Sequence, residues 1–184
     1  MNPSAFDIRR DIETDRLILR PHVLEDFDDS YALWSDEIVT RFIGGKPFSR
    51  EDVWSRLLRY VGHWTLLGYG YWAIREKDSG RFVGEIGFAD YQREIDPPLG
   101  DAPEIGWALM PSMHGFGYAT EAVRGALTWA DATWPGRDTV CIIAPDNVPS
   151  RRVAAKCGYV EERQTTYKGN PTGVFRRPGL ADQT

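Results

Sequence analysis

Cysteine and histidine are scarce in this chain, which has only 2 cysteines and 3 histidines among 184 residues. Neither Cys141 nor Cys157 belongs to a CxxC pair, and the histidines show no spacing typical of metal ligands. A disulfide framework and a metal site are therefore not expected. With 42% hydrophobic and 12% aromatic residues, the composition is that of an ordinary globular protein.

Long apolar runs are also lacking, since none approaches the roughly 20 residues that a membrane-spanning helix needs. The first residues, MNPSAFDIRRDIETDR, contain no apolar segment of the secretory type. We therefore expect a cytoplasmic protein without a membrane partner. Its length suits one domain, and we expect a flexible segment over 1–12, the domain over 13–177 and a C-terminal tail over 178–184.

Positive charge is in the minority, with 22 Lys and Arg against 27 Asp and Glu and a net charge of -5. A protein that grips nucleic acid normally presents a basic face, so no nucleic-acid partner is expected. An acidic surface suits a cationic partner such as an amine.

The N-terminal third predicts one strand and two amphipathic helices. RLILRP (16–21) is a short apolar run that ends at a proline, and 25–36 has aromatic residues at helical intervals. The second helix spans 49–68, where Ser49 and Asp52 have the spacing of a capping box. Its expected buried stripe is Val53, Leu57, Val61 and Trp64, and Gly68 is its expected end.

The remaining elements predict an α+β fold. Residues 70–91 are typical of a hairpin around the turn KDSG, and 102–110 of a third strand. A helix with a small-residue face reaches Trp134, and 138–144 is an apolar strand of the buried type. A short helix within 146–159 and two final strands around KGNP complete the order β-α-α-β-β-β-α-β-α-β-β.

The stretch HGFGYAT (114–120) places two glycines between a strand and a helix. Such a loop can aim several backbone amides at one point in front of the positive end of a helix dipole, a geometry that binds phosphate. The alternative is a tight turn that needs glycine for steric reasons. The stretch is neither a P-loop nor a dinucleotide-binding fingerprint.

A second motif, NVPSRRVAAKCGY (147–159), opens a short helix with Asn147 and Ser150. Asn147 can hydrogen-bond to backbone or amide groups, and Ser150 can cap the helix.

Together, EIGWALMPSMHGFGYATEAVRGALTWA and NVPSRRVAAKCGY resemble the GNAT superfamily of acyl-coenzyme A-dependent N-acyltransferases. ETDRLILRP and the hairpin WAIREKDSGRFVGEIGF match its RimJ/RimL-type subgroup, which includes enzymes acting on protein N-termini and on small amines. The resemblance covers about 13–177. It implies a largely antiparallel sheet of about six or seven strands with about four helices, in which a splayed strand pair holds acyl-CoA.

The resemblance also implies where acetyl-CoA binds. The pyrophosphate would lie on the backbone amides of 114–120, the pantetheine arm would pair with 108–110, and Asn147 would contact the arm. His114 departs from the superfamily pattern at the first position of the loop, where its backbone is what matters. The residues expected at the cofactor are Ala108, Leu109, Met110, His114, Gly115, Phe116, Gly117, Tyr118, Ala119, Thr120, Asn147 and Ser150.

Acetyl transfer to an amine needs a base, since an amine of pKa near ~10 is mostly protonated at neutral pH. Glu104 matches the catalytic glutamate of several family members and shares a strand face with Gly106 and Ala108. Glu85 and a water chain stay open as alternatives. Ser150 is the expected acid for the thiolate, with Tyr159 and Tyr167 as weaker options, because Ala154 stands where many relatives have a tyrosine.

We expect direct transfer in a ternary complex, since no histidine near Cys141 or Cys157 in sequence activates either thiol. The acceptor pocket is expected between the N-terminal helices and the hairpin, although aromatic residues at helical spacing are more often core. The sequence leaves the identity of the acceptor amine open, and the resemblance allows a homodimer. The alternative function is a module that binds coenzyme A without catalysis. The expected walls are Trp34, Phe42, Tyr69 and Trp72, with Asp28, Asp29, Asp36 and Glu37 to attract a cation.

Overall fold

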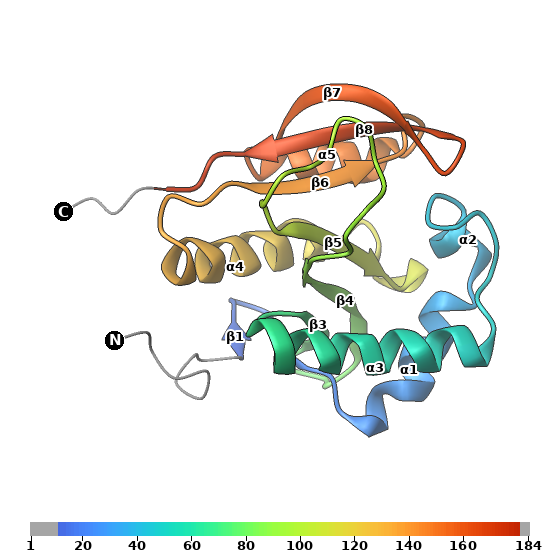
Figure 1. Cartoon of the computed structure of the whole chain (residues 1–184). Helices are drawn as coiled ribbons and strands as arrows, with labels where there is room; N and C mark the ends of the chain where they lie inside the picture. Colours follow the sequence, from blue (N-terminus) through green and yellow to red (C-terminus); the bar gives the residue numbers. More distant parts are fainter. Residues whose placement is uncertain (1–10, 181–184) are drawn as a thin grey trace.

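The computed structural model describes residues 11–180 and confirms the α+β prediction. Within this part of the chain, one eight-stranded sheet has the order β1-β2-β3-β4-β5-β6-β8-β7 (Figure 1). Every neighbouring pair is antiparallel except β5 and β6. The strands are β1 (Ile12–Glu13), β2 (Leu17–Pro21), β3 (Tyr71–Glu76), β4 (Phe82–Ala89), β5 (Glu104–Leu109), β6 (Thr139–Ile143), β7 (Val160–Tyr167) and β8 (Asn170–Arg177).

The predicted helix over 25–36 is present as two pieces, η1 and α1, and a separate short helix, α2, follows it. Asp36 explains the last break, because its carboxylate accepts from the amides of Ile38 and Val39 and so begins a new helix. The other predicted helices are present. The helices are η1 (Leu24–Asp26), α1 (Phe27–Trp34), α2 (Glu37–Thr40), α3 (Arg50–Leu67), η2 (Pro111–Met113), α4 (Tyr118–Thr133) and α5 (Val148–Lys156).

Helix α3 begins at the predicted capping box of Ser49 and Asp52. The prediction of Val61 in the buried stripe is wrong, because its side chain is exposed. Tyr60 is buried in its place and stacks on Tyr71 of β3 with ring centroids 4.4 Å apart. The stripe therefore advances by three residues from Leu57 to Tyr60 rather than by four, a spacing that helix geometry equally allows.

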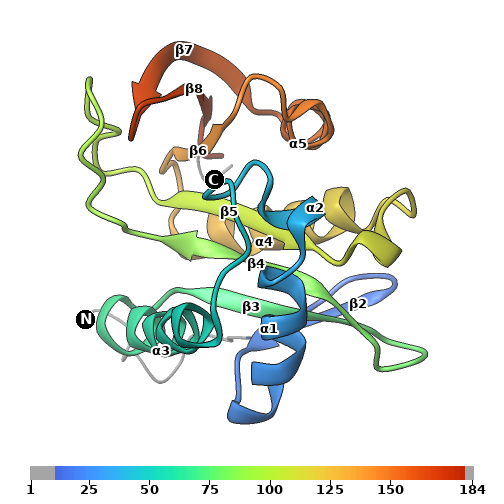
Figure 2. The ribbon, with the colours of Figure 1, turned by 90° about the vertical axis from the view of Figure 1, so that its right-hand side faces the viewer.

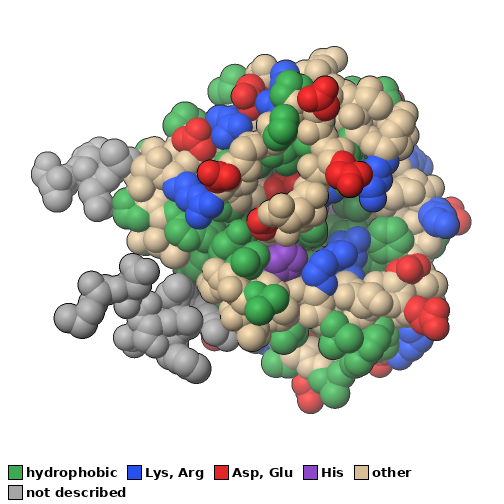
Figure 3. All heavy atoms as spheres, in the orientation of Figure 1, with side chains coloured by type: hydrophobic (Ala, Val, Ile, Leu, Met, Phe, Trp, Pro, Cys, Tyr) green, Lys and Arg blue, Asp and Glu red, His purple; other side chains and the backbone are tan. Residues whose placement is uncertain are grey.

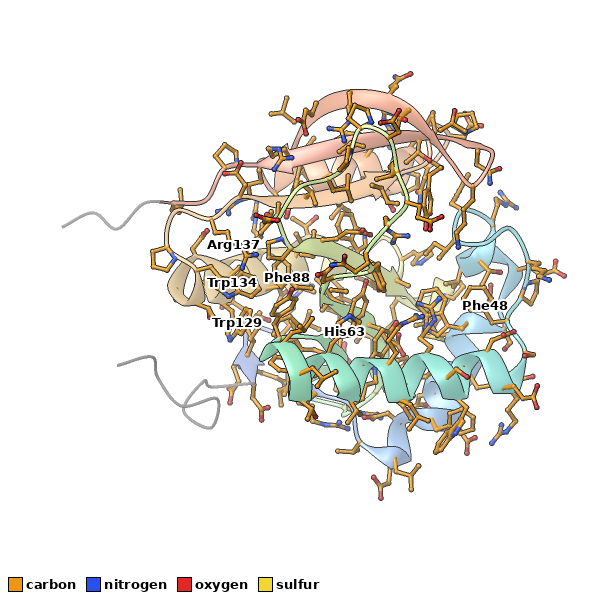
Figure 4. All side chains as sticks on the ribbon, viewed as in Figure 1. Phe48, His63, Phe88, Trp129, Trp134 and Arg137 are labelled. Atoms are coloured by element: carbon orange, nitrogen blue, oxygen red, sulfur yellow. The ribbon has the colours of Figure 1, made fainter. Side chains whose placement is uncertain are left out.

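Helices α3 and α4 cover opposite faces of the sheet. Tyr71 stacks on Tyr60 of α3, whereas the next residue, Trp72, contacts Trp129 of α4 and also Trp64 in the last part of α3, and neighbouring residues of a strand point to opposite faces. Figure 1 and Figure 2 show β3 and β4 between the two helices. On the α4 side, Phe88, Trp129 and Trp134 point toward one another (Figure 4). Arg137 lies over the Trp134 ring.

Strands β5 and β6 separate almost as soon as they meet. Their register contains the single pair Glu104 and Val140, whereas β5 pairs with β4 along its whole length. The loop 90–103, light green in Figure 1, bridges the two halves of the sheet. Its carbonyls accept hydrogen bonds from Arg163 and Thr165 of β7 and from Arg176 of β8.

The chain ends differ in part from the expected boundaries. Ile12 lies in the segment expected to be flexible, yet it pairs with Leu19 of β2; residues 1–10 lie outside the described part. In the tail, the Leu180 carbonyl accepts from the Gly136 amide, and 181–184 lie beyond the described residues. None of the described helices is long and apolar enough to cross a membrane.

Candidate active site

The glycine loop lies between η2 and α4 and needs glycine for its backbone conformation. Gly115 has φ +85° and Gly117 has φ +82°, both in the left-handed region that L side chains rarely adopt. A Cβ on Gly115 would meet nothing within 4 Å, and one on Gly117 would meet only Arg16 Nη2 at 3.7 Å. Crowding by neighbours is thus not what selects these glycines, and the space above the loop is open.

The loop gathers backbone amides that have no protein acceptor. Among the described residues, no backbone amide of 115–120 donates to another backbone group, and the ladder of α4 begins with Glu121 donating to Gly117. Arg16 stands beside the loop and donates from Nη1 to the Phe116 carbonyl at 3.0 Å, while its guanidinium is paired with Glu121 of α4. Unpaired amides at a helix N-terminus are the elements of an anion site.

Tyr118 and His114 of the loop are engaged elsewhere, whereas the Phe116 side chain is exposed. Tyr118 is buried, and its hydroxyl donates to Glu76. The His114 ring folds back to β5, where Nε2 lies 3.0 Å from the Leu109 carbonyl oxygen. The imidazole therefore fixes the loop to the strand through that contact.

The backbone groups of β5 point alternately to β4 and to the gap before β6. The Met110 amide donates to Val83 of β4, and backbone groups alternate in direction along a strand. The amides of Ala108 and Met110 therefore point to β4, and the predicted pairing of 108–110 with a pantetheine arm stays a prediction. Trp107 and Leu109 present their backbone groups to the gap between β5 and β6.

Helix α5 begins at Asn147, which corrects the expectation that Ser150 caps it. Asn147 Oδ1 accepts from the Ser150 amide at 3.2 Å. Both residues are half-buried. Among residues 11–180, the Ser150 hydroxyl forms no hydrogen bond, so it is left available to a ligand.

Glu104 begins β5 at the point where β6 separates from it. Its buried carboxylate is held through both oxygens by Arg93, with Nε–Oε2 2.5 Å and Nη2–Oε1 2.6 Å. Burial raises the pKa of Glu104, and Arg93 works against that rise. A cavity of about 320 Å³ adjoins the pair and is lined by Tyr91 and the loop that follows it.

Glu85 is a different kind of carboxylate. It is completely buried and accepts from the Ser30 hydroxyl at 2.6 Å and from the Trp34 indole at 2.8 Å. Burial pushes its pKa up, but His22, with Nε2 3.2 Å from Oε1, and these two donors hold the pKa below its usual value. Glu85 therefore ties α1 to β4 and is the weaker candidate base.

The remaining candidate nucleophiles and acids are buried, except Tyr167, which is half-buried. Burial raises the pKa of the Cys141 thiol and of the Cys157 thiol. Burial also raises the pKa of Tyr159, whose hydroxyl lies 2.6 Å from that of Thr139. The ring of Tyr167 contacts the Arg93 guanidinium, which lies over its face.

The expected acceptor walls do not meet in one pocket. Trp72 is completely buried on the α4 side, whereas Trp34 is buried on the α3 side. Tyr69 packs edge-on against Trp134. Phe42 is the exposed member of the four.

Three of the four acidic residues expected to attract a cation already interact with other groups of the protein. Asp28 pairs with Arg50 and Asp29 with Arg75. Asp36 caps α2.

Arg93 is the candidate site residue that sequence reasoning missed. It lies in a loop rich in proline and charge, eleven residues before Glu104, and no local pattern links the two. Only the return of the chain from β4 to β5 brings its guanidinium to the carboxylate.

The chain is similar to known acetyltransferases over most of its length. Residues 16–160 match the family model of the acetyltransferase (GNAT) domain. YoaA of Bacillus subtilis, named as an uncharacterized N-acetyltransferase, is 28% identical over 174 residues, with 89% of this chain and 94% of YoaA covered.

Solved structures share the fold. A protein of Bordetella pertussis assigned to the GnaT-family acetyltransferases superposes with a TM-score of 0.81 at 28% identity, covering 92% of this chain and 99% of that one. RimL, a ribosomal L7/L12 α-N-protein acetyltransferase solved with coenzyme A, has a TM-score of 0.76 at 18% identity, covering 94% and 99%. The likeness to RimL shows the common fold and leaves the RimJ/RimL subgroup as a prediction.

Proposed function

Since this chain belongs to the GNAT acetyltransferase family and is an acetyl-CoA-dependent acyltransferase, we propose that it acetylates a primary amine by direct attack in a ternary complex. The amine is that of a small molecule or of a protein N-terminus, in the manner of the RimJ/RimL subgroup. The enzyme acts in the cytoplasm as a monomer or a homodimer.

The observation that carries this proposal is the set of unpaired amides in the glycine loop. Acetyl-CoA brings an activated thioester and a pyrophosphate, and the amides of 115–120 fit the pyrophosphate because they lack protein acceptors and have open space before them. Arg16 lies beside them, where it donates to the Phe116 carbonyl and pairs with Glu121. The edge of β5 at Trp107 and Leu109 would receive the pantetheine amides, with the Leu109 carbonyl already in contact with His114 Nε2.

Glu104 is the base in this proposal. It lies on the α3 side of β5 where the strands separate, and a carboxylate with a raised pKa accepts a proton more readily near neutral pH. Arg93 fixes its direction and keeps it ionised when the amine arrives. A water molecule between Glu104 and the amine is compatible with the same role.

Ser150 is the proposed acid for the departing thiolate. Its amide is held by Asn147, which leaves the hydroxyl as a donor at the start of α5. Direct transfer is favoured over an acetyl-cysteine because burial raises the pKa of both cysteine thiols, which keeps them protonated and unreactive.

One observation favours a second candidate, a domain that binds coenzyme A without turnover. Both oxygens of Glu104 are engaged by Arg93, an arrangement that also suits a purely structural ion pair. In that case acetyl-CoA would bind without any acceptor.

Release of free thiol from acetyl-CoA, measured with and without a panel of primary amines, separates the two functions. The enzyme releases thiol only when an acceptor amine is present, with one N-acetyl product per thiol. Stabilisation by acetyl-CoA in a thermal-shift assay, with no release for any amine, would favour the binding module. Equal stabilisation by ATP would contradict a coenzyme A site.

A further inference from the structure

Arg56 differs from every other partly buried arginine of the described chain, because it has no carboxylate within ion-pair distance. The other seven each pair with Asp or Glu inside the protein. Removing a guanidinium from water without an opposite charge is costly, so an unpaired cation of this kind needs an explanation. The paired ones are Arg20, Arg75, Arg93, Arg151, Arg163, Arg176 and Arg177.

The Arg56 guanidinium is held in place by aromatic rings. It lies 3.9 Å from the Trp34 ring centroid and 4.8 Å from that of Phe48, and Nη1 donates to the Tyr60 hydroxyl at 3.2 Å. Figure 4 shows Phe48 between α2 and the N-terminal part of α3. A guanidinium has five N–H donors, so most of those of Arg56 have no acceptor in the described part of the protein.

The carboxylates on this side of the sheet are already engaged. Glu85 acts on Arg56 through space, but its oxygens accept from Ser30 and Trp34. Glu104 is taken by Arg93. Neither lies within ion-pair distance of Arg56.

Arg56 also lies on the same side of β5 as the candidate base. Its partner Tyr60 stacks on Tyr71, and a Cβ on Gly106 would come within 2.3 Å of the Tyr71 hydroxyl oxygen. Gly106 shares its strand face with Glu104. Figure 3 shows that this face of the molecule is hollowed near its centre, with basic, acidic and histidine side chains around the hollow.

We propose that Arg56 binds a carboxylate carried by the acceptor itself, so that the acceptor is a small amino acid rather than a simple amine or polyamine. A rigid, desolvated guanidinium recognises a planar carboxylate through two parallel hydrogen bonds. One unpaired guanidinium balances one negative charge, whereas a phosphate monoester carries about two at neutral pH. This inference rests on the proposed function and deepens it.

Matched pairs of acceptors test the inference on the unmodified protein. We expect kcat/KM for L-phenylalanine to exceed that for 2-phenylethylamine, and L-leucine to exceed isoamylamine, by roughly 10- to 100-fold. Each pair differs by the carboxylate. Equal rates within the pairs, or a preference for the decarboxylated members, would overturn the inference and leave acetylation of amines standing.

Substitutions of Arg56 test whether this residue causes the preference for acceptors with a carboxylate. Arg56→Gln should raise KM for the amino acids roughly 10- to 100-fold, leave the decarboxylated amines nearly unchanged and leave acetyl-CoA binding intact, while Arg56→Lys should recover part of the loss. Arg59→Gln is the matched control, because Arg59 is an exposed arginine on the same helix and its loss removes the same charge.

The outcomes separate the inference from the function on which it rests. Equal losses in the Arg56 and Arg59 variants would show a general charge effect and overturn direct recognition. A protein that binds acetyl-CoA but releases thiol with neither series of acceptors would overturn the proposed acetyltransferase function itself. Should Arg56→Gln not fold, the paired acceptors on the unmodified protein still decide.

Discussion

Arg93 grips both carboxylate oxygens of Glu104, at 2.5 and 2.6 Å, at the point where β5 and β6 separate. The two residues oppose each other in effect, since burial raises the pKa of Glu104 and the guanidinium restrains that rise. Arg93 thereby adjusts the pH at which the proposed base becomes ionised.

Arg93→Met should move the acidic limb of the kcat/KM profile to higher pH. Without the guanidinium, burial acts alone, the pKa of Glu104 rises further, and the ionised base appears only at higher pH. Glu104→Gln should lower kcat by about 10²-fold or more. Arg177→Met is the control, because Arg177 grips Asp131 in the same bidentate way elsewhere in the sheet. If the pH profile of kcat/KM is unchanged in Arg93→Met, Glu104 is not the base.

Gly117→Val should weaken acetyl-CoA binding while the fold persists. Valine at φ +82° is strained by about 1–2 kcal/mol, and its branched side chain would intrude on the open space before the amides. Gly136→Val carries the same strain at φ +73° beyond the other end of α4. Calorimetric titration should therefore show a loss of affinity in the first variant and not in the second. If Gly117→Val and Gly136→Val bind acetyl-CoA with equal affinity, the glycine loop is a turn that binds no ligand.

Ser150→Ala should lower kcat by roughly 10²-fold and leave the Kd for acetyl-CoA unchanged. The reason is that the hydroxyl is proposed to donate to a thiolate that exists only as the bond breaks. Ser55→Ala, an exposed serine on α3, serves as the control. If both variants keep the parental kcat, another group protonates the leaving thiolate.

The ion-paired carboxylate of Asp26 leads us to expect that the folded protein loses stability in acid. Burial raises its pKa, but Arg20, Arg75 and the Val23 amide together lower the pKa to about 2. The folded pKa lies below the unfolded one, so the contribution of about 2 kcal/mol is present above pH 4 and is lost as the pH falls towards 2. Urea unfolding of the parent and of Asp26→Asn should converge as the pH falls through this range. A constant difference between the two would contradict the shift.

Local patterns in the sequence predicted most of the elements. The capping box at Ser49 and the left-handed Gly68 at the end of α3 are set by neighbouring residues, and both are present as expected. These patterns have a limit: they predicted Val61 as buried, whereas the structure buries Tyr60 instead. Helical spacing allows either residue inward, and the stacking partner Tyr71 decides.

The candidate site was only partly predictable for the same reason. The amides of the glycine loop follow from one continuous stretch of chain. The Arg93–Glu104 pair and the aromatic cradle of Arg56 need residues that meet only in three dimensions. The direction of each β5 amide depends on how that strand pairs with β4, which no residue type encodes.

Initial rates of thiol release, with acetyl-CoA and an acceptor amine varied together, test the account most directly. Direct transfer predicts that both substrates are present on the enzyme at once, so double-reciprocal lines intersect and N-acetylated amine forms in step with thiol. Parallel lines, together with an acetylated enzyme formed before any amine is added, would contradict direct transfer.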